Sequence, residues 1–333
     1  MFRWQRDPSV KALLAARRFA GQPFEENEQV AFQIPVVNGP SLAAWCDSHL
    51  GSPVAAELFR TGHLTCVIGV RLADGREVVV KIRPATPRTV ACTEVQRRLF
   101  EYGYPCPQPL AGPAPLSGYE ATAESHVPGG NVLPDSGRAA QPFAVALAQL
   151  VALAPSPEEV PSLAPAPAWT AWNHNQDGLW PRPDEHDVDL NEVEGPGWID
   201  AAGQAARQRL LDGYDRTVIG HGDWLPDNLR WQGSRLLVAH DWDSLIADSE
   251  AVIAGLASAI YPGLATVAET RDFLTAYAAA RGRPFSPGDL QRCWAAGVWT
   301  RAFDAKEQHA TGQPVISLTQ GETHDRLRQA GLW

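Results

Sequence analysis

Two short apolar runs of the sequence each lead to residues that can bind metal or move protons. Residues 218–219 lead to Asp223 and Asn228, and residues 236–239 lead to Asp241. Asp223 and Asn228 stand five positions apart, the spacing at which a phosphoryl-transfer loop places a catalytic base and a magnesium ligand. Asp241 follows a turn-like Gln-Gly-Ser patch, where a second magnesium ligand is expected. None of these residues alone would indicate a function, but the three in this order and spacing predict a phosphoryl-transfer site.

A lysine in a predicted strand and a glutamate in a predicted helix extend this set. Residues 65–72 and 77–83 are β-rich runs joined by Ala-Asp-Gly-Arg, and Asp-Gly between apolar runs is a hairpin signal. Lys81 lies inside the second run, and residues 89–101 predict a helix with Glu94 near its middle. Standing alone, Lys81 would be read as a solvent-facing lysine. With the downstream cluster, the two residues indicate the ion pair that holds nucleotide phosphates in kinases.

The composition favours a globular protein with two lobes or domains. The chain has 333 residues, of which 44% are hydrophobic and 20% charged, and it is longer than most single cores. The formal net charge of -10 argues against nucleic acid as a partner, because nonspecific binding needs clustered Lys and Arg. The five cysteines are scattered without a C-x-x-C pair, so neither a disulfide framework nor a zinc site is indicated.

The sequence also bears on the compartment. The first 20 residues carry charges throughout, and their longest apolar run, residues 12–16, is too short for a signal peptide. No segment approaches the apolar length of a membrane span. We therefore expect a cytoplasmic, reduced protein without a membrane partner. The sequence indicates no particular oligomeric state.

The elements that must position the site residues divide into two predicted lobes. Residues 119–124 read as a strand, and the following Ser-His-Val-Pro-Gly-Gly predicts a hinge at 125–130. Residues 1–124, with a helical extension around 8–19, form the expected N-terminal lobe, and 131–333 form a mainly helical C-terminal lobe. Beyond the catalytic stretch, helices are expected over 250–260, 267–280 and 287–308.

The segment 168–200 combines aromatic and acidic residues. Its tryptophans are Trp169, Trp172, Trp180 and Trp198, and its acidic block is Asp184, Glu185, Asp187, Asp189, Glu192 and Glu194. No Lys or Arg stands between Arg182 and Arg207. The segment is either a solvated loop with aromatics packed beneath it or a recognition insert that binds a cationic acceptor.

With these motifs, the chain resembles the aminoglycoside phosphotransferase-like kinases, which include choline-kinase-type enzymes and share the protein-kinase fold. The resembling stretches are residues 80–82 with Glu94, residues 221–229 and residues 240–243. The resemblance implies an α+β, two-lobe fold. A small N-lobe would hold an antiparallel sheet and a helix, and a larger, mainly helical C-lobe would hold the catalytic loop, the metal site and the acceptor pocket.

The resemblance also implies a role for each site residue. Asp223 becomes the catalytic base that accepts the proton of the acceptor hydroxyl. Asn228 and Asp241 become ligands of Mg2+. Lys81, held by Glu94, contacts the α- and β-phosphates of ATP. Asp243 stands two residues beyond Asp241, and the resemblance favours Asp241 as the principal ligand.

By the same resemblance, the backbone at Ser125 and Val127 hydrogen-bonds the adenine, and His221 fixes the catalytic loop. The chain departs from the family pattern in three places. No G-x-G-x-x-G covers the phosphates, His240 stands where an aliphatic residue is more usual, and residues 247–251 replace the usual Gly-Asp-Pro stretch. The last two departures bear on the acceptor more than on the chemistry.

The expected activity is ATP- and Mg2+-dependent phosphoryl transfer to a hydroxyl of a small molecule, with a cationic antibiotic or metabolite favoured by the acidic segment. Two alternatives stay open: a kinase-like protein that binds nucleotide without transfer, and a kinase of a neutral sugar or other metabolite. A metal-dependent phosphoesterase would need more histidine ligands than His221 and His240. A protein kinase is disfavoured because nothing resembles its activation segment.

Overall fold

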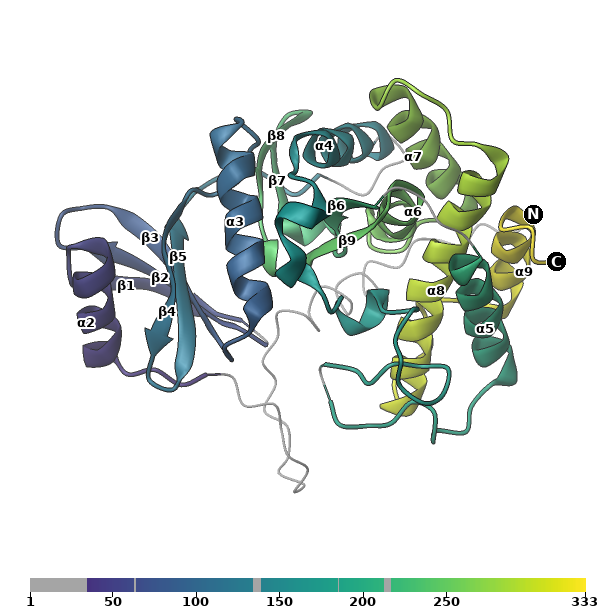
Figure 1. Ribbon diagram of the computed structural model, residues 1–333, viewed down its shortest axis with the longest axis horizontal. Helices are drawn as coiled ribbons and strands as arrows, with labels where there is room; N and C mark the ends of the chain where they lie inside the picture. Colours follow the sequence, from purple (N-terminus) through teal and green to yellow (C-terminus); the bar gives the residue numbers. More distant parts are fainter. Residues whose placement is uncertain (1–34, 63, 134–138, 185, 213–216) are drawn as a thin grey trace. The chain divides into compact units, whose positions relative to one another are not determined.

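The computed structural model describes residues 35–62, 64–133, 139–184, 186–212 and 217–333 (Figure 1). The helix expected around residues 8–19 lies outside them. By their internal contacts the described residues form two compact units. The first comprises the residues up to Thr86 together with Pro107–Pro128, and the second comprises Pro87–Cys106 and Gly129–Trp333.

The first unit is built on a five-stranded antiparallel sheet with the order β1-β2-β3-β5-β4. Its strands are β1 (Val54–Thr61), β2 (Cys66–Leu72), β3 (Glu77–Arg83), β4 (Pro109–Leu116) and β5 (Tyr119–Ser125). Ile68, Val80 and Ile82 of the central strands are fully buried, and helix α2 (Gly39–Leu50) contributes to the same core. The apolar runs that predicted β2, β3 and β5 are the buried middle of this sheet.

The two strands that the sequence analysis did not identify are the edges of the sheet. Most residues of β1 are exposed, so no alternating apolar pattern marks it. β4 contains several prolines, which strands tolerate at a sheet edge because the edge needs fewer ladder hydrogen bonds. Between β1 and β2, Gly62 has φ +126°, and a Cβ there would lie 1.8 Å from the Thr65 carbonyl oxygen. This turn therefore requires glycine.

The second unit is mainly helical. Its helices are α3 (Pro87–Glu101), α4 (Ala140–Leu153), α5 (Gly197–Leu211), α6 (Glu250–Ile260), α7 (Val267–Ala280), α8 (Pro287–Ala310) and α9 (Gln320–Gln329). Helix α8 packs against α5, α6 and α9. A Cβ at Gly255 of α6 would lie 2.2 Å from the Cys293 carbonyl oxygen of α8, so the two helices cross at a distance that only glycine allows. Within the described ranges, no helix is long and apolar enough to cross a membrane.

Two short strand pairs complete the second unit: β6 (Thr217–His221) with β9 (Leu245–Ser249), and β7 (Leu229–Gln232) with β8 (Arg235–Ala239). Short 3-10 turns connect the elements: η1 (Pro157–Glu159), η2 (Pro161–Leu163), η3 (Ala168–Thr170), η4 (Pro226–Asn228) and η5 (Trp242–Ser244). Helix α3 packs against η2 and η5 and so belongs to this unit. The lobe boundaries expected from the sequence stay a prediction.

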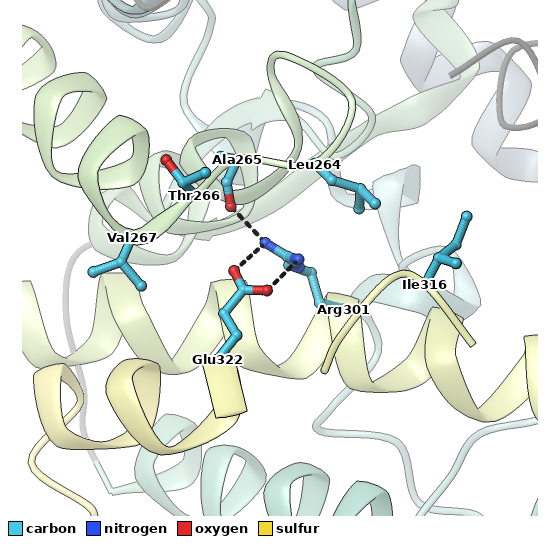
Figure 2. Close-up of a pocket in the computed structure, with 7 residues that line it drawn as sticks. All are labelled: Leu264, Ala265, Thr266, Val267, Arg301, Ile316 and Glu322. Atoms are coloured by element: carbon cyan, nitrogen blue, oxygen red, sulfur yellow. Dashed lines mark hydrogen bonds and ion pairs between the residues drawn. The ribbon is translucent and has the colours of Figure 1, made fainter. Parts of the chain in front are cut away.

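Buried arginine side chains connect helices α8 and α9 by hydrogen bonds and ion pairs. Arg301 of α8 donates through Nη1 to the Ala265 carbonyl at 2.6 Å, and its guanidinium pairs with Glu322 of α9 (Figure 2). Glu322 also pairs with Arg326 at 2.8 Å. A guanidinium is buried without large cost only where carbonyls and carboxylates accept its protons. The hollow in Figure 2, of about 350 Å³, is lined by this structural network, by Thr266 and by apolar residues, and none of its lining residues belongs to the catalytic stretch.

Candidate active site

The pairing of β6 with β9 brings the two predicted catalytic segments together. Gly220 lies opposite Ile246, and the Gly222 N–H donates to the Ser244 carbonyl at 2.7 Å. The loop after β6 carries Asp223, and the loop before β9 carries Asp241. Both loops lie at the same end of the strand pair, so side chains far apart in the sequence share one site.

Asp223 and Asn228 are directly hydrogen-bonded. The Asn228 Nδ2 group donates to Oδ2 of Asp223 at 2.9 Å and to the Asp223 carbonyl at 2.9 Å. The turn η4, which starts at Pro226, brings the asparagine back toward the aspartate. Because the amide nitrogen faces Asp223, Asn228 offers its Oδ1 oxygen to a cation. Asp223 is 9% exposed, so solvent reaches a small part of it.

His221 links the two loops through its ring. The Asp223 N–H donates to Nδ1 at 3.2 Å, so Nδ1 is an acceptor and the ring proton lies on Nε2. Nε2 then donates to the His240 carbonyl at 3.1 Å. The fully buried imidazole thus has both nitrogens occupied by backbone groups. It fixes the two loops and has no nitrogen left for proton transfer.

Asp241 occupies a strained and electrostatically unfavourable position. Its φ is +60°, in the left-handed region that non-glycine residues rarely adopt, and such strain is concentrated at functional sites. Burial raises the pKa of its carboxyl group, and the negative charges of Asp223 and Asp243 raise it further. The Ser244 hydroxyl donates to Oδ2 at 2.6 Å and partly opposes this effect. The conformation is therefore held by its surroundings.

These properties fit a divalent cation. Three carboxylates repel one another here, and a bound cation would remove that repulsion. Among the described residues, no group of three or more His, Cys, Asp or Glu side chains is arranged to hold a metal ion by itself. Magnesium in phosphoryl-transfer sites is usually bound by one or two protein oxygens together with phosphates and water. Asn228 and Asp241 together would provide two such protein oxygens.

In the first unit, Lys81 is paired with a residue that the sequence analysis did not identify. Its Nζ lies 3.0 Å from Oε1 of Glu124, and the side chains are only 12% and 8% exposed. Lys81 lies opposite Thr122 in the β3–β5 register, so Glu124 is two residues along the neighbouring strand. No local signal in the sequence marks this partner, because the same strand also contains Glu120.

Glu94, the partner expected for Lys81, lies on α3 in the second unit. It accepts from Arg97 at 2.6 Å and from Arg98 at 2.9 Å. The hydrogen bond from Arg98 is the main reason that the pKa of Glu94 is lowered. Because Lys81 and Glu94 belong to different units, their pairing stays a prediction.

Ser125 is held at the end of β5. Its N–H donates to the Gln108 carbonyl at 2.9 Å, and its Oγ accepts from the Gln108 N–H at 2.9 Å. An adenine ring could therefore use the Ser125 carbonyl but not its N–H. Val127 lies just beyond the strand. Both adenine contacts stay predictions.

The segment 168–200 begins against the catalytic loop. Trp169 of η3 donates through Nε1 to the Gly222 carbonyl at 3.3 Å. Trp172 and Trp180, however, are buried; Trp180 is 1% exposed and packs 5.3 Å from the Trp299 ring. These two tryptophans belong to the core and offer no open aromatic face. The interpretation of the segment as a solvated loop predicted aromatic residues packed beneath it, and Trp172 and Trp180 are packed in this way.

The comparisons with known proteins agree with this fold. A model of the phosphotransferase enzyme family, APH, matches residues 65–246, which is more than half of the chain. The chain therefore belongs to this family. In sequence comparison, no curated protein matches the chain.

Several solved structures share the fold. Aminoglycoside phosphotransferase APH(4)-Ia, a thermostable mutant in a ternary complex with ADP and hygromycin B, is 14% identical with TM-score 0.58, covering 87% of this chain and 98% of that chain. Amicoumacin kinase hAmiN, in complex with AMP-PNP, Ca2+ and Ami, is 11% identical with TM-score 0.54, covering 98% and 92%. Macrolide 2'-phosphotransferase MphH from Brachybacterium faecium, an apoenzyme, is 16% identical with TM-score 0.55, covering 87% and 97%.

These findings confirm the α+β, protein-kinase-like fold and the family resemblance. By its family, the chain is a phosphotransferase.

The family resemblance, together with the left-handed φ of Asp241, predicts that Asp241 matters more than Asp243 for the metal. In Asp241→Ala, Mg2+ should no longer strengthen ATP binding, a loss of about 2–3 kcal/mol, since a charged contact is removed. In Asp243→Ala most of the effect should remain. Calorimetric ATP titrations with and without Mg2+ measure both variants. A severe defect in Asp243→Ala with a mild one in Asp241→Ala would reverse the assignment.

Proposed function

We propose that this protein transfers the γ-phosphoryl group of ATP to a hydroxyl of a small molecule, with Asp223 as the base and Mg2+ held by Asn228 and Asp241. The observation that carries the proposal is the meeting of these three residues at one end of the β6–β9 pair. The 2.9 Å bond from Asn228 to Asp223 and the raised pKa of Asp241 support it.

Asp223 orients the acceptor hydroxyl and takes its proton. A bond from the acceptor oxygen to the γ-phosphorus forms, the bond between that phosphorus and the β–γ bridging oxygen of ATP breaks, and ADP leaves with that oxygen. The hydroxyl proton moves to the Asp223 carboxylate and later to solvent. Asn228 fixes Oδ2 of Asp223, so the carboxylate keeps one orientation while the proton moves.

The other residues serve the nucleotide. Mg2+ bound by Asn228 and Asp241 would neutralise charge on the β- and γ-phosphates. Lys81 binds the α- and β-phosphates, with Glu94 as its further partner. Glu124, already 3.0 Å from Lys81, holds the ammonium group and limits its rotamers. The Ser125 carbonyl and the Val127 N–H bind the adenine.

Mutation can separate the proposed role of Asp223 as the base from that of Lys81 in binding the phosphates. Asp223→Asn should lower turnover by about 100- to 10,000-fold, the usual contribution of positioned proton transfer, while ATP affinity stays at the wild-type value. Lys81→Ala should weaken ATP binding by about 1–3 kcal/mol, because a charge-assisted contact is lost. Turnover assays and ATP titrations, each with and without Mg2+, measure both effects. Arg71→Ala, which removes an exposed cation on the neighbouring strand β2, is the control.

Wild-type turnover in Asp223→Asn would mean that another residue is the base. Equal ATP affinity in wild type and Lys81→Ala, whether or not Mg2+ is present, would overturn the nucleotide roles. ATP binding without turnover on any acceptor would favour a nucleotide-binding protein that does not transfer.

For the acceptor, we infer a cationic, hydroxyl-bearing small molecule that binds beside the segment 168–200. The contact of Trp169 with the Gly222 carbonyl supports this location, because Gly222 precedes the proposed base. Carboxylates of the acidic block concentrate cations near it. The tight packing of Trp172 and Trp180 restricts the aromatic contribution to Trp169 and Trp198, which are partly buried.

A screen of ATP consumption over aminoglycosides, peptide and nucleoside antibiotics, amino alcohols and neutral sugars identifies the acceptor class. With a cationic acceptor, combined amide substitution of Asp184, Glu185, Asp187 and Asp189 should raise the acceptor KM and leave kcat nearly unchanged. The wild-type KM should also rise with ionic strength, because salt screens exposed charges.

The matched control removes charge elsewhere in the second unit: Asp272→Asn and Asp325→Asn, on exposed positions of α7 and α9, should leave the KM unchanged. A neutral sugar turned over well, with no response to the substitutions, would contradict the cationic acceptor and return the segment to a solvated loop.

A further inference from the structure

Arg88, the second residue of α3, donates to four backbone carbonyls. Its Nη1 group bonds the Leu163 carbonyl and, at 3.3 Å, the Pro165 carbonyl. Its Nη2 group bonds the Leu245 carbonyl and, at 3.0 Å, the Asp243 carbonyl. One half-buried guanidinium thus joins α3 to two segments that lie far away in the sequence.

One of these segments is the loop that carries Asp241. The carbonyls of Asp243 and Leu245 flank Ser244, which makes the contacts that shape the loop. The Ser244 hydroxyl donates to Asp241 at 2.6 Å, its N–H donates to the Asp241 carbonyl at 3.1 Å, and its own carbonyl accepts from the Gly222 N–H at 2.7 Å. Fixing the peptides on both sides of Ser244 therefore fixes Asp241 and the start of the catalytic loop.

The other segment leads to η3. Leu163 and Pro165 precede Trp169, whose indole bonds the Gly222 carbonyl. Arg88 is thereby connected to Gly222 by two routes, one through Ser244 and one through the chain that ends at Trp169. Both routes lie within the second unit.

The chemistry of this contact requires a guanidinium. Carbonyls that point into a protein need a donor, and an unpaired one costs about 1–3 kcal/mol. A planar fork reaches separate acceptors with its two terminal nitrogens, whereas an ammonium is a single point of charge. Lysine at position 88 could not serve both segments in the same geometry.

We propose that Arg88 is a positioning residue for the metal site. It holds the peptides around Ser244 so that Asp241 keeps its left-handed conformation beside Asp223 and Asn228, and it does so without touching substrate. The inference rests on the proposed function, because it takes Asp241 as the metal ligand.

The experiment compares Arg88→Ala and Arg88→Lys with the wild type. In the nucleotide-free and metal-free protein, the amides of Gly222 and Ser244 should exchange with deuterium about tenfold faster in both variants, because local opening of the loop becomes easier. In turnover assays the half-saturating Mg2+ concentration should rise about tenfold, while the ATP KM at saturating Mg2+ stays near the wild-type value. Millimolar guanidinium ion should restore part of the Mg2+ response in Arg88→Ala.

The control is Arg281→Ala. Arg281, at the end of α7, likewise donates to two backbone carbonyls, those of Arg283 at 3.0 Å and Pro284 at 3.2 Å, and its bonds among the described residues lie away from the metal loop. This variant should leave Mg2+ dependence and both exchange rates at their wild-type values. If Arg88→Ala does not fold, Arg88→Lys alone decides by the same readouts.

An Arg88 variant that merely lowers the Tm, with unchanged exchange at Gly222 and Ser244 and unchanged Mg2+ dependence, would overturn the inference. The exchange measurement needs no activity. A failure of the proposed function, seen as absent Mg2+-dependent turnover in the wild type, is thereby distinguishable from a failure of the role of Arg88.

Discussion

The burial of Asp241 beside Asp223 and Asp243 is the constraint that the two catalytic loops must satisfy. Burial and the neighbouring charges of Asp223 and Asp243 raise the pKa of Asp241, so ionised Asp241 opposes folding and neighbouring groups must hold it in place. The groups are side chains bonded to backbone: the His221 ring spans the two loops, and Ser244 bonds Asp241 from within its own turn. Such an arrangement lowers stability in the free protein and prepares the site for a cation, as catalytic preorganisation requires.

Hydrogen bonds to main-chain groups perform most of this positioning. Strands β6 and β9 set the distance between the loops, and indole and guanidinium groups then bind the carbonyls that emerge from them. A backbone held in this way moves little when a distant surface residue changes. The fold thus holds the catalytic loops rigidly. The segment 168–200, which precedes them in the sequence, is free to differ in charge and shape with the acceptor.

What the sequence could predict depended on whether the signal was local. The spacing of Asp223 and Asn228 is a property of one turn, and Asp241 ends an apolar run, so both loops were identified from the residues themselves. The pairing of Lys81 with Glu124 depends on the β3–β5 register, which no local pattern specifies. Strands β1 and β4 were missed because edge strands carry little apolar alternation. Arg88 was missed because a side chain that binds carbonyls leaves no motif: its partners are peptide groups of any residue.

If Asp223, Asp241 and Asp243 are clustered to bind a cation, the charge of Asp241 does not stabilise the fold of the cation-free protein. Comparing the free energy of unfolding of Asp241→Asn and wild type in chelator, without divalent ions or nucleotide, tests it most directly. An acid whose folded pKa is raised costs stability as pH increases through that pKa, so removing its charge relieves the fold near neutral pH. We predict that Asp241→Asn unfolds at a free energy equal to or above that of the wild type in chelator. A variant markedly less stable than the wild type under these conditions would contradict the account, because Asp241 would then be a structural residue.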